Sequence, residues 1–72
     1  MQIYSRYTQS TYRYAHHMGS GERIPAFAEA WVVNSRGERS ADISLCGDDF
    51  PNLEGHELTA KAVAILRRQI GH

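Results

Sequence analysis

The residues best suited to binding or chemistry lie near the N-terminus, where tyrosine, arginine and histidine follow one another closely. Tyrosine rings exposed on a sheet can stack on unpaired bases, and neighbouring arginines can hold phosphate. The same residue types are enriched among the hot spots of protein interfaces. A third interpretation is structural, with the tyrosines completing the core and covering a sheet edge. The candidate binding residues are Tyr4, Arg6, Tyr7, Tyr12, Arg13, Tyr14 and His16, and His17 follows them.

Histidine and cysteine side chains supply the candidates for metal binding and nucleophilic chemistry. His16 and His17 are adjacent, so in a strand they point to opposite faces, and no CxxC, HxxxH or HExxH spacing occurs. Cys46 is the single cysteine, and as a nucleophile it would need a base and an activating environment that a sequence cannot show. His56 and His72 complete the set. We therefore expect no metal site and no cofactor.

Two loops offer weaker chemical possibilities. The stretch Met18-Gly19-Ser20-Gly21-Glu22 could present backbone amides to phosphate, but no GK[ST] follows it. We interpret it as a turn or flexible loop. Asp48, Asp49 and Glu54 could bind a cation, although the alternating acidic pattern of a calcium loop is absent. Without a Ser/His/Asp constellation or a convergent carboxylate pair, the sequence predicts a protein that is not an enzyme.

These residues must be positioned by a hairpin that turns at Asn34-Ser35-Arg36-Gly37. Asparagine suits the first position of a type I turn, and Gly37 supplies the positive φ of a bulge that re-enters the strand. This register gives a core face of Phe27, Glu29, Trp31, Val33, Ala41, Ile43 and Leu45. A register without the bulge would move Ala41, Ile43 and Leu45 to the other face. We favour the bulged register because it gives Gly37 a role.

The opposite face of the hairpin carries short side chains, among them Ala26, Ala28, Ala30, Val32, Ser40, Asp42, Ser44 and Cys46. Short side chains allow close approach, so the N-terminal strands, a partner surface or a second copy of the chain could lie there. Glu29 is the misfit of the core face. It is either an exposed carboxylate at an edge, which we favour, or a buried one paired with an arginine such as Arg6 or Arg13.

An amphipathic helix is predicted from Leu58 to Ile70. At 100° per residue its apolar stripe contains Leu58, Thr59, Ala62, Val63, Leu66 and Ile70. The helix begins at Asn52 or nearer Gly55, and Gly71 is its predicted C-cap. Phe50 is expected to plug the end of the core. Residues 2–17 form either two strands, Gln2–Tyr7 and Thr11–His17, or one long bent strand.

These elements predict an α+β fold with the order ββββα. A small antiparallel sheet of three to four strands carries one C-terminal helix packed on one face, and residues 1–72 form a single domain. One cysteine allows no intrachain disulfide and fits a reducing compartment. No apolar run approaches a membrane span, and the first residues lack the apolar block of a signal peptide. We therefore expect a soluble, cytoplasmic protein with no membrane partner.

The formal net charge of zero argues against whole-molecule attraction to nucleic acid. Our hypothesis is a small non-enzymatic protein-binding module, an inhibitor or regulator that occupies a surface of a larger protein or complex. Small inhibitors from phages and mobile elements, anti-CRISPR proteins included, have this size and content, which is an argument from frequency alone. The alternative is an RNA or single-stranded DNA binding module that uses the tyrosine- and arginine-rich N-terminal strands.

Overall fold

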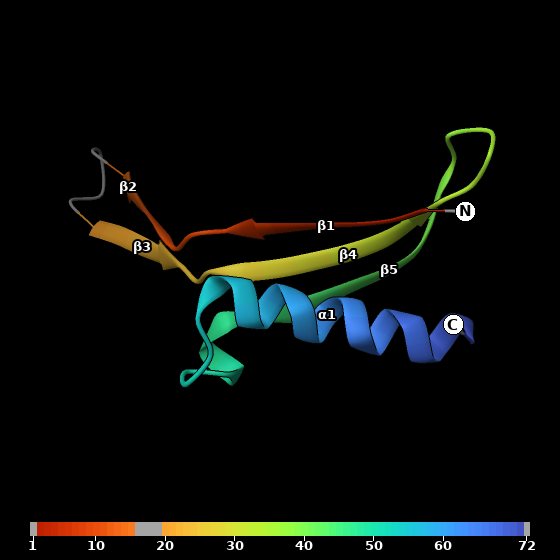
Figure 1. The fold of residues 1–72 in the computed structure, drawn as a ribbon. Coiled ribbons are helices and arrows are strands. Elements are labelled where there is room, and N and C mark those ends of the chain that lie inside the picture. The colour runs from red at the N-terminus through yellow and green to blue at the C-terminus, as the bar shows by residue number, and fades with distance from the viewer. Residues whose placement is uncertain (1, 16–19, 72) are drawn as a thin grey trace.

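The computed structural model describes residues 2–15 and 20–71. Three strands form an antiparallel sheet in the order β1-β4-β5, and two further strands form a separate antiparallel pair, β2-β3. One helix, α1, lies along one side of the three-stranded sheet (Figure 1). The predicted α+β class with a C-terminal helix is confirmed. The elements are β1 (Gln2–Thr8), β2 (Thr11–Ala15), β3 (Ser20–Ile24), β4 (Phe27–Val33), β5 (Arg39–Cys46), the short 3-10 helix η2 (Gly47–Asp49) and α1 (Gly55–Ile70).

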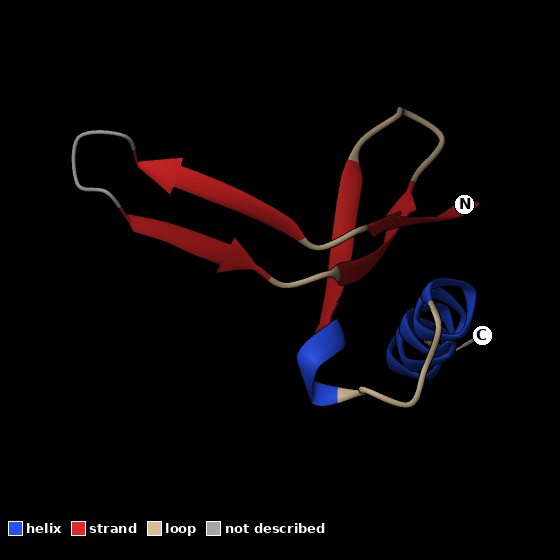
Figure 2. Ribbon diagram, turned by 90° about the vertical axis from the view of Figure 1, so that its left-hand side faces the viewer, coloured by secondary structure: helices blue, strands red, loops and turns tan. Residues whose placement is uncertain are grey.

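The two sheets share one hairpin register. Thr8 lies opposite Phe27 in the first ladder and Thr11 lies opposite Ile24 in the second, so three residue steps separate the pairs on each strand. The ladder is interrupted beside Pro25, which has no N–H to donate. We call the outer part, β2 with β3, the arm, and Figure 2 shows it projecting beyond the sheet and helix.

The arm settles the interpretation of the N-terminal region within the described residues. Residues 2–15 form two strands rather than one, as the first alternative predicted. The predicted loop at residues 18–22 is wrong from residue 20 onwards, because Ser20 to Ile24 form β3, a strand that the sequence pattern did not predict. The sequence hides this strand, because its first four residues are polar or glycine and show no apolar alternation; β3 pairs with β2, which continues the same register. His16, His17, Met18 and Gly19 lie outside the described residues.

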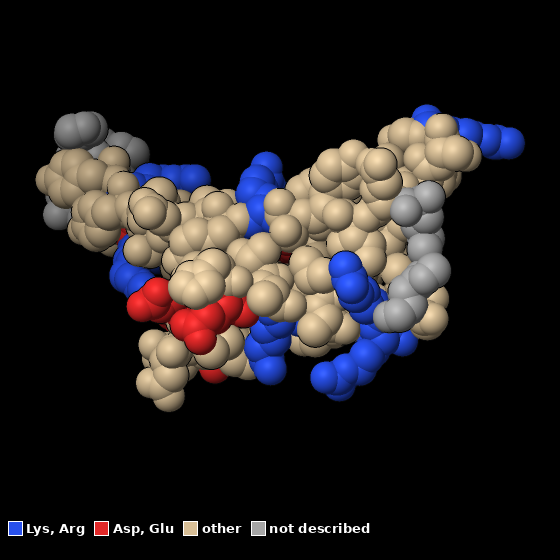
Figure 3. Space-filling view, viewed as in Figure 1, with Lys and Arg blue, Asp and Glu red and all other residues tan. Residues whose placement is uncertain are grey.

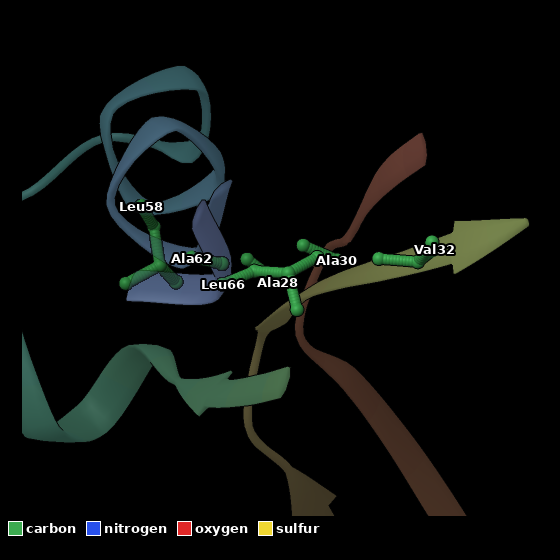
Figure 4. Close-up of a cluster of buried hydrophobic side chains, with 6 residues drawn as sticks. All are labelled: Ala28, Ala30, Val32, Leu58, Ala62 and Leu66. Atoms are coloured by element: carbon green, nitrogen blue, oxygen red, sulfur yellow. The ribbon is translucent and has the colours of Figure 1, made fainter. Parts of the chain in front are cut away.

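The core is small and lies between β4 and α1. Leu66 is completely buried and Leu58 is 2% exposed, and these are the largest fully buried side chains among the described residues. Each such leucine contributes about 1.5–3 kcal/mol to folding. The predicted helical stripe is therefore confirmed, and Phe50 packs against the core as expected. The buried residues are Ala28, Ala30 and Val32 from β4 and Leu58, Ala62 and Leu66 from α1, all shown in Figure 4.

The predicted core face of the hairpin is wrong. The turn itself is as expected, since Gly37 has φ +80° and Val33 lies opposite Arg39. A second irregularity opposite Trp31 then shifts the register, so that Ala30 pairs with Ile43 and Ala28 with Leu45. The face pairing that results is the one we rejected.

A single backbone conformation accounts for this second shift. Ala41 has φ +51°, a left-handed conformation that favours glycine and costs an alanine roughly 1–2 kcal/mol. Nothing in the sequence marks that position. The helix then packs on the alanine face, where small side chains permit close approach and Ile3, Ile43 and Leu45 supply volume at the sides. The surface that we expected to receive a partner is thus occupied by α1.

The ends of α1 follow local chemistry. The helix starts at Gly55, the later of the two predicted positions, with Glu54 as its N-cap. The Glu54 backbone N–H donates to Oε1 of Glu57 at 3.1 Å, so this N–H group has a hydrogen-bond partner at the helix start. Gly71 ends the helix with φ +81°, as predicted for a C-cap.

Candidate functional site

The face of the sheet opposite α1 carries the most concentrated group of aromatic and charged side chains. β-Strand alternation and the β1-β4 register place Tyr4 opposite Trp31 and Arg6 opposite Glu29 on this face. No element among the described residues covers it (Figures 1 and 2). We call it the open face, and its residues are Tyr4, Arg6, Phe27, Glu29, Trp31, Val33 and Arg39.

Trp31 is held in place from both neighbouring strands. The Tyr4 ring stacks beside it with a centroid distance of 6.2 Å and an interplanar angle of 18°. The guanidinium carbon of Arg39 lies 4.1 Å from the centroid of the Trp31 ring, within the range of a cation–π interaction. Aromatic pairs and cation–π contacts each contribute about 0.5–1.5 kcal/mol at partly exposed sites. Trp31 is therefore a fixed ring on an uncovered surface.

Glu29 joins two arginines on the same face as Trp31. Its Oε1 accepts from Arg6, with Nε at 3.2 Å, and its Oε2 accepts from a terminal nitrogen of Arg39, also at 3.2 Å. The Glu29 side chain is 18% exposed. The hydrogen bond from Arg6 lowers the pKa of Glu29 below its usual value, which partial burial opposes. The favoured prediction of an exposed edge carboxylate is wrong, and the alternative of pairing with Arg6 is confirmed.

The arm presents a second aromatic surface. Tyr12 is 67% exposed and Tyr14 is 50% exposed, and alternation places both on one face of β2. The Tyr12 ring lies over Gly21, where any side chain would collide with it. Arg13 points to the other face, where Glu22 is its cross-strand neighbour.

An ion pair joins the arm to η2, the short helix that follows β5. The two terminal nitrogens of Arg23 donate to the two carboxylate oxygens of Asp48 at 2.9 and 3.1 Å. The hydrogen bond from Arg23 lowers the pKa of Asp48. Figure 3 shows the acidic side chains gathered below the arm, close to η2 and the start of α1, whereas lysine and arginine are spread along the molecule. The basic early part of the chain thus meets the acidic later part at this junction.

The structure divides the predicted binding residues among three places. Tyr4 and Arg6 lie on the open face. Tyr7 lies on the helix side, where its ring would come within 2.8 Å of a side-chain carbon placed at Gly55. Tyr12, Arg13 and Tyr14 lie on the arm, and His16 falls outside the described residues.

Sequence reasoning missed Trp31 and Arg39 as members of a surface. The bulged register predicts Trp31 on the core face, together with Ile43 and Leu45. The useful sign was Glu29, two residues away on the same face, since a carboxylate on a fully buried face would need costly pairing. A glutamate and a tryptophan on one strand face, near several arginines, indicate a partly exposed surface.

Two further features have ligand-binding potential. A cleft of about 450 Å³ lies between the arm and the core, and its lining includes Tyr7, Arg23, Phe50 and Leu58. On the first turn of α1, ligand atoms of Glu54, His56 and Glu57 lie within 4.8 Å of one another, and all three residues are exposed. Carboxylates and imidazole are suitable metal ligands, but exposed acidic side chains at a helix start also stabilise the helix dipole.

Comparison with known proteins finds no match for this chain. The chain matches no family model, no curated protein sequence and no solved structure. Across the described residues, the structure has no helix of the length and apolar character needed to cross a membrane.

Proposed function

We propose that the chain is a non-enzymatic protein-binding module, and that the open face is the surface with which it occupies a larger protein. The observation that carries this proposal is the ring of Trp31, fixed by Tyr4 and Arg39 on a sheet face that no second layer covers within residues 2–15 and 20–71. Tryptophan, tyrosine and arginine are the residues most enriched among interface hot spots. Such a module would act as an inhibitor or regulator in the cytoplasm, where Cys46 stays reduced.

The shape and rigidity of the open face support a protein partner. The arm at one end and the turn between β4 and β5 at the other rise above it, so the face is concave (Figures 1 and 3). Because Trp31 and Glu29 are already held by neighbouring strands, little side-chain freedom remains to be lost on binding, and that loss is a principal cost of association.

Charge pairing favours protein over nucleic acid at this face. Arg6 and Arg39 both donate to Glu29, and Arg39 also donates to Asp42 at 3.1 Å. Arginines whose charge is balanced by carboxylates contribute less to phosphate binding, which depends on the release of counterions.

A second candidate function belongs to the arm. The exposed rings of Tyr12 and Tyr14, with Arg13 on the adjacent position, suit stacking on single-stranded RNA or DNA. A two-stranded ribbon can also enter a groove of duplex DNA. The two functions use different residues, so substitutions separate them.

The test begins with capture of partners from an extract of the source cell, with and without nuclease. The isolated partner is then titrated with the wild-type chain and with Tyr4→Ala, Trp31→Ala and Tyr12→Ala, and the melting temperature of each variant is measured. Binding through the open face predicts that Tyr4→Ala and Trp31→Ala each weaken association by more than about 1 kcal/mol. Tyr12→Ala, on the arm, is the matched control and should bind as the wild type does.

Wild-type affinity of folded Tyr4→Ala and Trp31→Ala would contradict the proposal. Loss of the captured partner after nuclease treatment, with a steep fall of affinity as salt rises, would instead support nucleic-acid binding. In that case Tyr12→Ala and Arg13→Ala should carry the effect.

A further inference from the structure

The outer edge of β1 is an uninterrupted strand edge. All seven residues from Gln2 to Thr8 pair in continuous register with β4, and the other side of β1 has no partner strand among the described residues. The segment contains no proline or glycine. The opposite edge of the sheet, β5, is different, because the irregularity at Ala41 interrupts it. Unpaired N–H and C=O groups on a regular edge are a template for another strand.

The side chains of β1 are arranged symmetrically about Ser5. On the helix side, Ile3 and Tyr7 lie two residues before and after it. On the open face, Tyr4 and Arg6 lie one residue before and after it. Ser5 itself is small and exposed. A strand with this pattern is complementary to a second copy of itself, which is the requirement of a two-fold interface.

We propose that β1 pairs with β1 of a second copy in antiparallel register about Ser5, forming a six-stranded sheet. In this register Ile3 lies opposite Tyr7 of the second copy, an apolar contact that extends the core. Tyr4 lies opposite Arg6 of the second copy, a pair that permits a cation–π contact. The two Ser5 residues meet at the axis, where their small side chains leave the backbones free to approach.

The helices leave room for this arrangement. α1 packs chiefly on β4, with β1 and β5 on either side. In the dimer the two β4 strands are three strand spacings apart, roughly 14 Å, whereas packed helices need about 8–10 Å between axes. The two helices therefore lie on the same side of the sheet without collision. The Tyr7 side chains, 40% exposed in the single chain, face the space between them.

The exposed area of the single chain is consistent with a missing partner. The chain exposes 5310 Å², whereas a compact protein of 8.1 kDa exposes about 4500 Å². The excess, roughly 800 Å², comes partly from the projecting arm and partly from uncovered surfaces such as the β1 edge, and it is comparable with the area that one partner contributes to a standard interface. The dimensions of 47 × 30 × 15 Å show the same openness.

Disulfide capture tests the register directly. In a Cys46→Ser background, Ser5→Cys places two thiols at the axis with Cα atoms about 4.5–5.5 Å apart, within disulfide range. Gln2→Cys is the matched control, since Gln2 is also exposed but would lie six positions from its own copy, about 20 Å away. Under mild oxidation we expect Ser5→Cys to form a linked dimer at least about tenfold faster than Gln2→Cys. A mixture of Gln2→Cys and Thr8→Cys should cross-link with each other.

Sedimentation equilibrium of the wild-type chain gives a second readout that no substitution can disturb. The proposal predicts a species of twice 8.1 kDa that dissociates on dilution. Ser5→Lys should shift this equilibrium towards monomer, because two like charges would meet at the axis, while Ser44→Lys on β5 should not. A wild-type monomer at every concentration, or equal cross-linking rates for Ser5→Cys and Gln2→Cys, would overturn the proposal. The edge would then be open to a strand of another protein.

Discussion

The two halves of the long hairpin, β1 with β4 and β2 with β3, follow one register but have different surroundings. In the inner half, β1 and β4 gain a third strand and a helix, and six apolar side chains are buried there. In the outer half, β2 and β3 have neither among the described residues, and Tyr12 and Tyr14 of β2 remain exposed. Two-stranded hairpins are marginal on their own in water. The difference shows that a register continues across an interruption, but that stability requires a second layer.

The same contrast separates two kinds of binding surface. On the inner half, Trp31 and Glu29 of β4 are fixed by residues from the two neighbouring strands, β1 and β5. On the arm, the Tyr12 ring lies over Gly21, and an exposed ion pair between Arg23 and Asp48 joins the arm to η2. Exposed ion pairs contribute about 0–1 kcal/mol. A preorganised surface suits specific protein recognition, and a loosely anchored ribbon suits adaptable contacts.

The largest difference between the halves should be in stability. Leu66→Ala removes a completely buried side chain and should lower the free energy of unfolding by about 2–5 kcal/mol. Arg67→Ala, at the next and exposed helix position, is the local control and should have little effect. Tyr12→Ala on the arm should also change the urea midpoint only slightly. An arm substitution as costly as Leu66→Ala would mean that the arm belongs to the cooperative core.

Glycine substitutions compare how strongly the backbone is constrained in the β4-β5 turn and in the arm. Gly37→Ala should cost about 1–2 kcal/mol, because φ is +80° there and no neighbouring atom lies near enough to add a clash. Gly21→Ala would push aside only the ring of Tyr12, an exposed side chain that can move, so its cost should stay within about 0.5 kcal/mol. Thermal melts of both variants provide the comparison. Equal shifts would contradict the assignment of the turn as the more constrained site.

A smaller effect should appear in the pH dependence. The folded-state pKa of Glu29 is lowered, so its ion pairs stabilise the fold above the unfolded pKa of about 4.3, and this contribution is lost as the pH falls through the folded pKa. Glu29→Gln should therefore be less stable than wild type at neutral pH, and the two should converge in acid. Glu22→Gln on the arm serves as control. Parallel stability curves for wild type and Glu29→Gln would refute the role of these ion pairs.

Local patterns were enough to predict much of the fold. The helix stripe, the turn at Asn34, the positive φ of Gly37 and the C-cap at Gly71 depend on residues close in sequence, and all were predictable. The face that the helix covers was not, because it depends on the backbone of Ala41. One alanine in a left-handed conformation transferred Ile43 and Leu45 to the other face. No residue preference signals such a position.

The candidate site was predictable only in part. Tyr4 and Arg6 were named because their types suit interfaces, and both lie on the open face. Trp31 and Arg39 were missed, since their surroundings depend on which face the helix leaves uncovered. Tyr7 is the same residue type as Tyr4 but points to the helix side of the sheet. Residue type identified candidates, whereas the register decided which of them share a surface.

The most direct test of binding through the open face uses the fluorescence of Trp31, the single tryptophan of the chain. Its emission and its quenching by acrylamide are measured for the free protein and during titration with the isolated partner. Binding at the open face predicts a shift to shorter wavelength and protection from the quencher, both saturating with the bound fraction. Unchanged emission and quenching at saturation would contradict the account and move attention to the arm.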